Sequence, residues 1–85
     1  MEIHYKTRGT CSRSIHVKLN DQGVIESCFF ESGCPGNTQG VAALSVGRRA
    51  EDVIACCRGI QCRNGTSCPD QLAKALQAAL DQQAQ

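Results

Sequence analysis

The sequence predicts an α+β domain: an antiparallel sheet of two or three strands, followed by three helices packed on one face. Two observations lead to this prediction. Up to Glu31, apolar residues alternate with polar ones, which is typical of strands. After Asn37 they recur every three or four positions, which is typical of helices. The period changes near Cys34, so the chain divides into a strand half and a helix half.

The composition fits one small domain over residues 1–85. The chain has no Trp, one Tyr and two Phe, so Val, Ile, Leu, Ala and Cys must supply the core. A formal net charge of +1 lacks the strongly basic character typical of nucleic-acid-binding domains. The polar N-terminus has no signal-peptide pattern, and no apolar run approaches the roughly 18 residues of a membrane helix. We therefore expect a cytoplasmic protein that binds neither nucleic acid nor membrane.

Three strands are expected in the N-terminal half, over residues 1–8, 14–19 and 24–31. In the first strand, the odd-numbered residues from Ile3 to Thr7 lie on one face and the polar even-numbered residues on the other. Turn-forming residues from Asn20 to Gly23 predict that the second and third strands form an antiparallel hairpin. Pairing of the first strand with the second would extend the hairpin to a three-stranded meander.

Three helices are expected in the C-terminal half. The first follows the break Ser32–Asn37 and ends at Gly47, which suits a C-terminal cap. The second runs from about Ala50 to Arg58. The third runs from Pro69 to about Gln82, and its leucines form an apolar stripe that should pack on the sheet: Leu72, Leu76 and Leu80.

Seven cysteines make up about 8% of the chain, which is near the level of a disulfide-rich scaffold. Without export the compartment is reducing, and clustered cysteines then indicate a metal site or catalysis rather than disulfides. Cys28 and Cys57 lie inside an expected strand and an expected helix, where a cysteine acts as a small packing residue. Cys56 lies beside Cys57 on the same helix and points about 100° away from it, so it is expected at the boundary of the core.

The other four cysteines lie in breaks between elements: Cys11, Cys34, Cys62 and Cys68. Cys68 precedes Pro69 and is expected at the N-cap of the last helix, where the helix dipole stabilises a thiolate. The breaks could meet at one end of a small domain. Four thiolates there would suit a tetrahedral zinc ion or an iron–sulfur cluster, and the residues leave that choice open. Such a site would also stabilise a small core.

The chain resembles the TSCPD domain family of small bacterial proteins, named for the motif Thr66–Asp70. The resemblance covers nearly the whole chain and rests on these further segments: Gly9-Thr10-Cys11-Ser12, Gly33-Cys34-Pro35-Gly36-Asn37, Gly59-Ile60-Gln61-Cys62 and Cys68-Pro69-Asp70-Gln71-Leu72-Ala73. Related domains occur at the C-termini of some ribonucleotide reductases. The resemblance therefore implies an alternative role, as a domain associated with ribonucleotide reductase, and a reductase as partner.

The chain is also similar, more distantly, to the U-type iron–sulfur cluster assembly scaffold. In that family a cysteine precedes a hairpin, a Phe-x-x-x-Gly-Cys segment ends it, and a third cysteine opens the last helix. The similarity places the three cluster cysteines at Cys11, Cys34 and Cys68, with Cys62 as an added fourth thiolate. Ser67 stands where that family has a histidine, and Arg13 stands where it has an acidic residue. The similarity to the U-type scaffold implies a scaffold-like fold and iron–sulfur assembly proteins as partners.

Taken together, the sequence favours a small metal-binding protein that holds zinc or an iron–sulfur cluster, either for cluster assembly and transfer or as an accessory module. A thiol redox enzyme is the other alternative. Against it, the chain has no C-x-x-C motif. His4 and His16 lie in expected strands and have no obvious partner for general-base catalysis.

Overall fold

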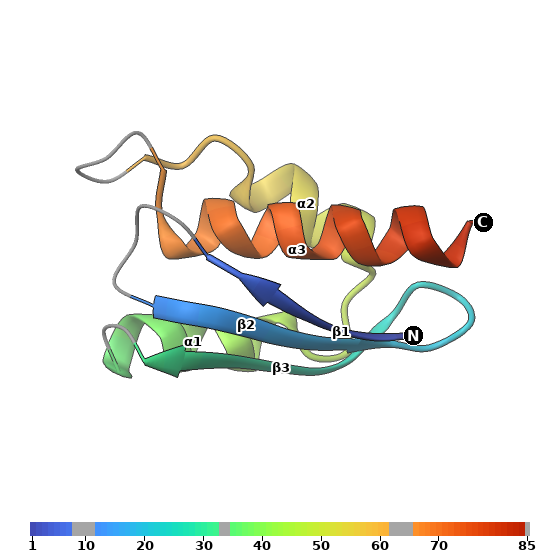
Figure 1. Cartoon of the computed structure of the whole chain (residues 1–85), viewed down its shortest axis with the longest axis horizontal. Helices are drawn as coiled ribbons and strands as arrows, with labels where there is room; N and C mark the ends of the chain where they lie inside the picture. Colours follow the sequence, from blue (N-terminus) through green and yellow to red (C-terminus); the bar gives the residue numbers. More distant parts are fainter. Residues whose placement is uncertain (8–11, 33–34, 62–65, 85) are drawn as a thin grey trace.

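The computed structural model describes residues 1–7, 12–32, 35–61 and 66–84. Three strands precede three helices, which confirms the predicted α+β order (Figure 1). The elements are β1 Glu2–Lys6, β2 Ser12–Leu19, β3 Ile25–Ser32, α1 Pro35–Ser45, α2 Ala50–Cys57 and α3 Cys68–Gln83.

The strands form an antiparallel meander in the order β1-β2-β3, so the three-stranded arrangement is confirmed. The Asn20 side chain holds the β2–β3 turn, because its Oδ1 accepts from the backbone N–H of Gln22 at 2.8 Å and of Val24 at 3.0 Å. Gly23 has a φ of 78°, a left-handed conformation that favours glycine. The turn chemistry thus fixes the hairpin register.

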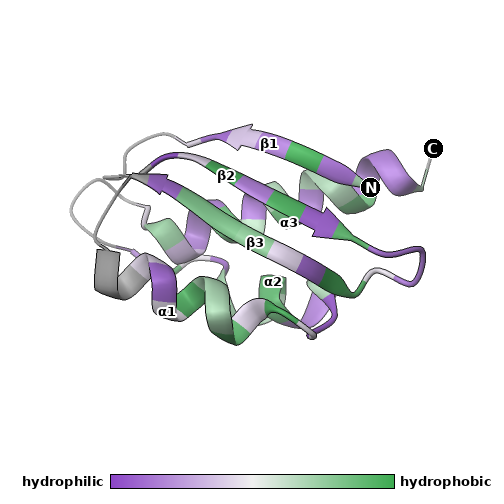
Figure 2. Ribbon diagram, turned by 90° about the horizontal axis from the view of Figure 1, so that it is seen from below, coloured by the Kyte–Doolittle hydropathy of each residue, from purple (hydrophilic) through white to green (hydrophobic). Residues whose placement is uncertain are grey.

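The core lies between one face of the sheet and α3. Ile15, Val17 and Leu19 point from β2 into this layer, and each is at most 1% exposed. From α3, Leu72 and Leu76 are fully buried, as the apolar stripe predicts, and Leu80 is partly buried. Burying a leucine contributes roughly 2 kcal/mol, so this layer is the main apolar contribution to stability. Figure 2 shows the opposite face of the sheet, with α3 behind it.

The other two helices contact different parts of the molecule. α1 runs along β3, and α2 packs against α3 through its buried Val53 and Ile54 (Figures 1 and 2). α1 begins at Pro35, inside the segment expected as a break. The reason is that proline is suited to the first turn of a helix, where its missing N–H costs no hydrogen bond.

The third strand begins one residue later than expected, at Ile25. Val24 instead forms an isolated bridge with Arg49. Ile25 then exchanges backbone hydrogen bonds with the segment after α1, donating to Arg48 O and accepting from Gly47 N, both at 2.8 Å. This segment therefore covers the start of β3.

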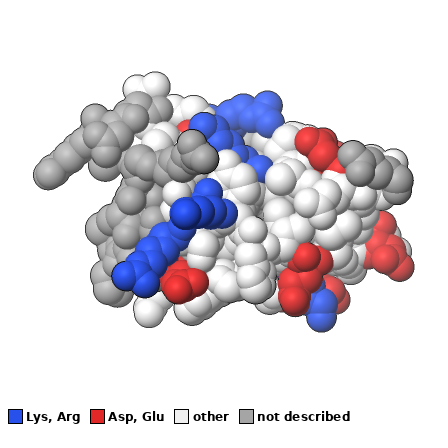
Figure 3. Space-filling view, in the orientation of Figure 1, with Lys and Arg blue, Asp and Glu red and all other residues white. Residues whose placement is uncertain are grey.

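The described surface carries both signs of charge. On the face drawn in Figure 3, acidic and basic side chains are interspersed, in keeping with the small net charge. Within the described ranges, no helix has the length and apolar character needed to cross a membrane.

Candidate functional site

Several described segments end or begin at one end of the molecule. β1 leaves the sheet where β2 enters it, since Thr7 N donates to Arg13 O at 3.1 Å. β3 ends beside the same point, because Ser32 is the register partner of Ser12. α1 and α3 also begin at this end (Figure 1). The flanks of residues 8–11 and 33–34 and the start of α3 are therefore close together.

Cys68 lies at this end as the first residue of α3 and is 5% exposed. The expected N-cap position is corrected by one residue, because the N-cap is Ser67. Its Oγ accepts from the backbone N–H of Asp70 at 3.1 Å. A serine hydroxyl is a better acceptor for the free N–H groups of a helix start than a thiol, which explains the shift. Cys68 is thus in the first turn and contacts the core.

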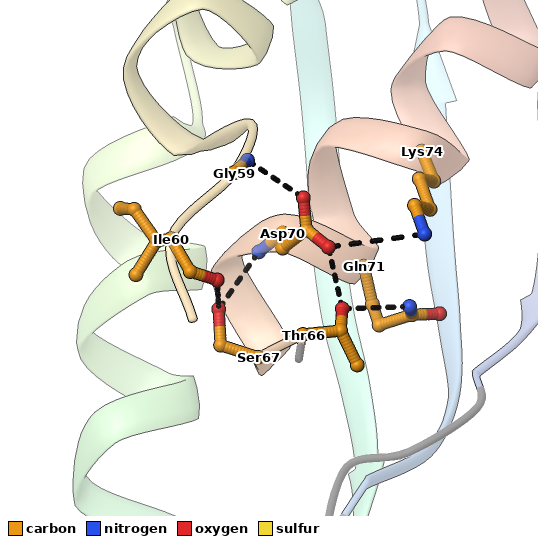
Figure 4. A network of polar contacts seen from close by, with 7 residues as sticks. All are labelled: Gly59, Ile60, Thr66, Ser67, Asp70, Gln71 and Lys74. Carbon is orange, nitrogen blue, oxygen red and sulfur yellow. Dashed lines mark hydrogen bonds and ion pairs between the residues drawn. The ribbon is translucent and has the colours of Figure 1, made fainter. Parts of the chain in front are cut away.

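A network of polar side chains surrounds this helix start (Figure 4). The Asp70 carboxylate is its centre. Oδ1 accepts from the backbone N–H of Gly59 at 2.7 Å, and Oδ2 accepts from the hydroxyl of Thr66 at 2.5 Å. Thr66 Oγ1 in turn accepts from the Gln71 amide at 3.0 Å, and Lys74 Nζ lies 3.8 Å from Oδ2. Three polar groups therefore converge on one buried carboxylate: the Gly59 N–H, the Thr66 hydroxyl and the Lys74 ammonium.

The network joins the end of α2 to the start of α3. Gly59 has a φ of 84°, which favours glycine, and this conformation directs its N–H at Asp70. The Ser67 hydroxyl also donates to the carbonyl of Ile60 at 2.6 Å. Every buried side-chain nitrogen or oxygen in the described ranges has a hydrogen-bond partner. The residues before 62 and after 65 are therefore held firmly next to each other.

The network also fixes the charge of Asp70. The hydrogen bond from Thr66 is the main cause that lowers the pKa of this carboxyl, with further contributions from Gly59 N–H, Lys74 and Arg58. Asp70 is therefore an anion in the first turn of α3, where the helix dipole favours negative charge. The hydrogen bonds from Gly59 and Thr66 are strengthened because the carboxylate that accepts them is charged.

Of the four predicted metal ligands, the structure describes one. Cys68 is buried at the start of α3, whereas Cys11, Cys34 and Cys62 lie outside the described residues. Within the ranges that are described, no group of three or more His, Cys, Asp or Glu side chains could hold a metal ion. The four-cysteine site therefore stays a prediction.

The three cysteines interpreted as packing residues are all described. Cys28 and Cys57 are partly buried against the core, as expected, while Cys56 is exposed. Burial, together with the nearby Cys57, raises the pKa of Cys28 to about 11. Burial and then Cys56 raise the pKa of Cys57. Both thiols are thus protonated at neutral pH, which disfavours a nucleophilic or metal-binding role.

The sequence marked four network residues as part of the family resemblance but assigned them no structural role: Thr66, Ser67, Asp70 and Gln71. Part of the signal was present, because Ser67-x-x-Asp70 matches the capping pattern of a helix start. The pattern does not reveal that the Asp70 carboxylate turns to Gly59 and Thr66. Those partners depend on where α2 ends in space.

A second polar cluster lies on the sheet face that α3 does not cover. His16 Nε2 is 3.4 Å from Glu31 Oε2, so this histidine has a carboxylate neighbour that the sequence did not indicate. Ser14 Oγ donates to the same oxygen at 2.9 Å, and this hydrogen bond is the main cause that lowers the pKa of Glu31. Ser14 Oγ also lies 3.4 Å from His16 Nε2, so the serine, the histidine and the carboxylate form one cluster on this face.

Comparison with known proteins gives one finding. The family model of the TSCPD domain matches residues 2–80, which is nearly the whole chain. No curated protein and no solved structure matches the chain significantly.

Proposed function

The chain belongs to the TSCPD domain family, and on that premise we propose that it is a small metal-binding module. Its ligands are the thiolates of Cys11, Cys34, Cys62 and Cys68, which hold a zinc ion or an iron–sulfur cluster. Bound there, the metal joins distant parts of a small chain and supplies stability that its core lacks.

One observation carries the proposal: the described residues next to all four cysteines lie at the same end of the molecule (Figure 1). Cys11 precedes Ser12, whose register partner is Ser32. Cys34 comes two residues after Ser32, and consecutive Cα atoms are about 3.8 Å apart. Chain connectivity thus supports a common location for these two thiols.

The connection between α2 and α3 supports the other two ligands. Cys62 follows Gln61, which is next to Ile60, and the Ile60 carbonyl accepts from Ser67 one residue before Cys68. The Asp70 network fixes both flanks of residues 62–65. A rigid frame of this kind suits thiolates that must meet at about 2.3 Å from one ion.

The charge of the helix start also suits the donor set. Four thiolates outweigh the charge of one zinc ion, so such a site carries excess negative charge. The N-terminus of α3 offers the positive end of the helix dipole to stabilise it. We propose that the site holds its ion or cluster as an accessory or assembly module, with iron–sulfur assembly proteins or a ribonucleotide reductase as partners.

The experiment is elemental analysis of anaerobically purified protein, together with its visible spectrum. One zinc per chain in a colourless protein supports a zinc module. A brown protein that contains iron and sulfide supports a cluster. A metal-free protein in which one thiol is alkylated rapidly would contradict the proposal and support the thiol redox enzyme instead.

A further inference from the structure

β1 is an edge strand of the described sheet. The sheet order is β1-β2-β3, and α1 with residues 47–49 lies along the other edge, at β3. Figure 2 shows β1 at the border of the sheet, with β2 on one side and no described strand on the other. An edge strand presents unpaired N–H and C=O groups and can accept another strand.

The hydrogen-bond pattern shows which residues of β1 present these groups. Met1 N and Leu19 N each bond the other residue's carbonyl, at 2.9 and 2.7 Å, and Thr7 N donates to Arg13 O. In an antiparallel pair the bonded positions alternate, so the odd-numbered residues of β1 bond to β2. The N–H and C=O groups of Glu2, His4 and Lys6 therefore point to the outer edge. The ring centroids of His4 and His16 are 4.0 Å apart, as suits the closer, non-hydrogen-bonded kind of pair.

We propose that this edge pairs with β1 of a second copy of the chain, antiparallel and centred on His4, to give a continuous six-stranded sheet. In this register Glu2 lies opposite Lys6 of the second copy, and Lys6 opposite its Glu2. Ile3 lies opposite Tyr5 of the second copy, on the side that faces the core. The sequence Glu2–Lys6 is thus complementary to itself in both charge and hydropathy.

The same register matches the backbone. Because its centre pairs His4 with His4 of the second copy, every outward-facing residue meets another outward-facing residue. This gives about six backbone hydrogen bonds. Shifting the pairing by two residues keeps the hydrogen-bond phase but shortens the overlap and separates the Glu2–Lys6 pairs. A shift by one residue loses the hydrogen bonds altogether. One register is therefore favoured over its neighbours.

The pairing also covers apolar surface that the single chain leaves partly exposed. Ile3 and Tyr5 are partly buried against the core, and each would gain an apolar neighbour across the new strand pair. Only a five-residue strand is added on each side, so the dimer should be weak, with a Kd between about 10 µM and about 1 mM.

The test is sedimentation equilibrium of the full chain across this concentration range. We expect the average mass to rise from 9.1 kDa toward twice that value. Glu2→Lys and Lys6→Glu should each raise the Kd at least about tenfold, because like charges then lie opposite each other. The double variant Glu2→Lys/Lys6→Glu should restore dimerisation. The matched control is Glu26→Lys on the exposed side of β3, which should leave the Kd unchanged.

The double variant separates pairing from effects inside one chain. Within the chain, residue 2 lies opposite Lys18, so a purely internal effect of Glu2→Lys would not be rescued by a change at residue 6. His4→Pro is a second test, because its N–H faces outward and its loss removes no bond to β2. It should abolish the dimer, while His4→Ala should retain it.

Amide hydrogen exchange gives a residue-level readout. At high concentration the amides of Glu2, His4 and Lys6 should become protected, whereas those of Ile3 and Tyr5 are protected at all concentrations. A mass of 9.1 kDa across the whole range would overturn the proposal. So would a dimer that tolerates His4→Pro and both single charge reversals.

Discussion

Cys68 and Cys28 both contact the hydrophobic core, yet their surroundings differ. Cys68 opens α3 beside a buried anion and a network of hydroxyl, amide and backbone groups. Cys28 lies in the middle of β3 opposite Val17, and burial raises its pKa to about 11. The difference teaches that burial alone does not indicate a cysteine's role. Cys28 packs inside a strand, whereas Cys68 stands at a helix start whose neighbouring residues form a polar network.

The largest expected effect comes from metal removal, which should depend on Cys68 and not on Cys28. Apparent binding free energies of structural zinc are roughly 10 kcal/mol or more, comparable to the whole stability of a small domain. A strong chelator should therefore lower the melting temperature sharply or unfold the chain. Cys28→Ser is the matched control, and its melting should remain equally sensitive to the chelator. If the chelator removed all the metal and the melting temperature did not change, the result would contradict a stabilising site.

The second effect in size is the loss of the Asp70 carboxylate. Asp70→Ala removes the acceptor of Gly59 N–H and of the Thr66 hydroxyl, and unsatisfied buried groups should cost about 3 kcal/mol in total. Urea unfolding measures this change. The matched control is Asp81→Ala, near the exposed end of the same helix, which should change stability by less than about 0.5 kcal/mol. An equal loss of unfolding free energy in both variants would show that the Asp70 network does not stabilise the start of α3.

A smaller effect is expected at Cys28. Cys28→Ser places a hydroxyl where the sulfur packs against the core, at a cost of about 1 kcal/mol. Thermal melting should show this loss with the metal content unchanged. If Cys28→Ser instead released metal, the contrast between the two cysteines would fail.

The smallest effect is a dependence on acid. The pKa of Asp70 is lower in the folded chain than in the unfolded one, so its stabilisation is present above about pH 4 and is lost as the pH falls further. Asp70→Asn lacks this group. The melting temperatures of wild type and Asp70→Asn should therefore converge below about pH 4. A difference that stayed constant down to pH 3 would show that the carboxylate gains nothing from folding.

The fold could be predicted because it depends on local patterns. Alternation in β1 and β2, the turn at Asn20–Gly23 and the leucine stripe of α3 each follow from neighbouring residues. The start of β3 was missed because Val24 pairs with Arg49, a contact between distant parts of the chain. Sequence period carries no information about such a bridge.

The site could be predicted only in part, for the same physical reason. Cys68 was expected at a helix start, and it lies within one residue of the expected position. The network around it could not be foreseen, because Gly59 reaches Asp70 only once α2 and α3 have packed. The ligand roles of Cys11, Cys34 and Cys62 rest on their position between elements and on family resemblance.

Metal content across the seven single Cys→Ser variants tests the central claim most directly. Each variant is purified anaerobically, and bound zinc, iron and sulfide are quantified per folded chain. The four-thiolate site predicts a large loss for the variants of Cys11, Cys34, Cys62 and Cys68. It predicts wild-type content for Cys28, Cys56 and Cys57. Equal metal content in both groups would contradict the site.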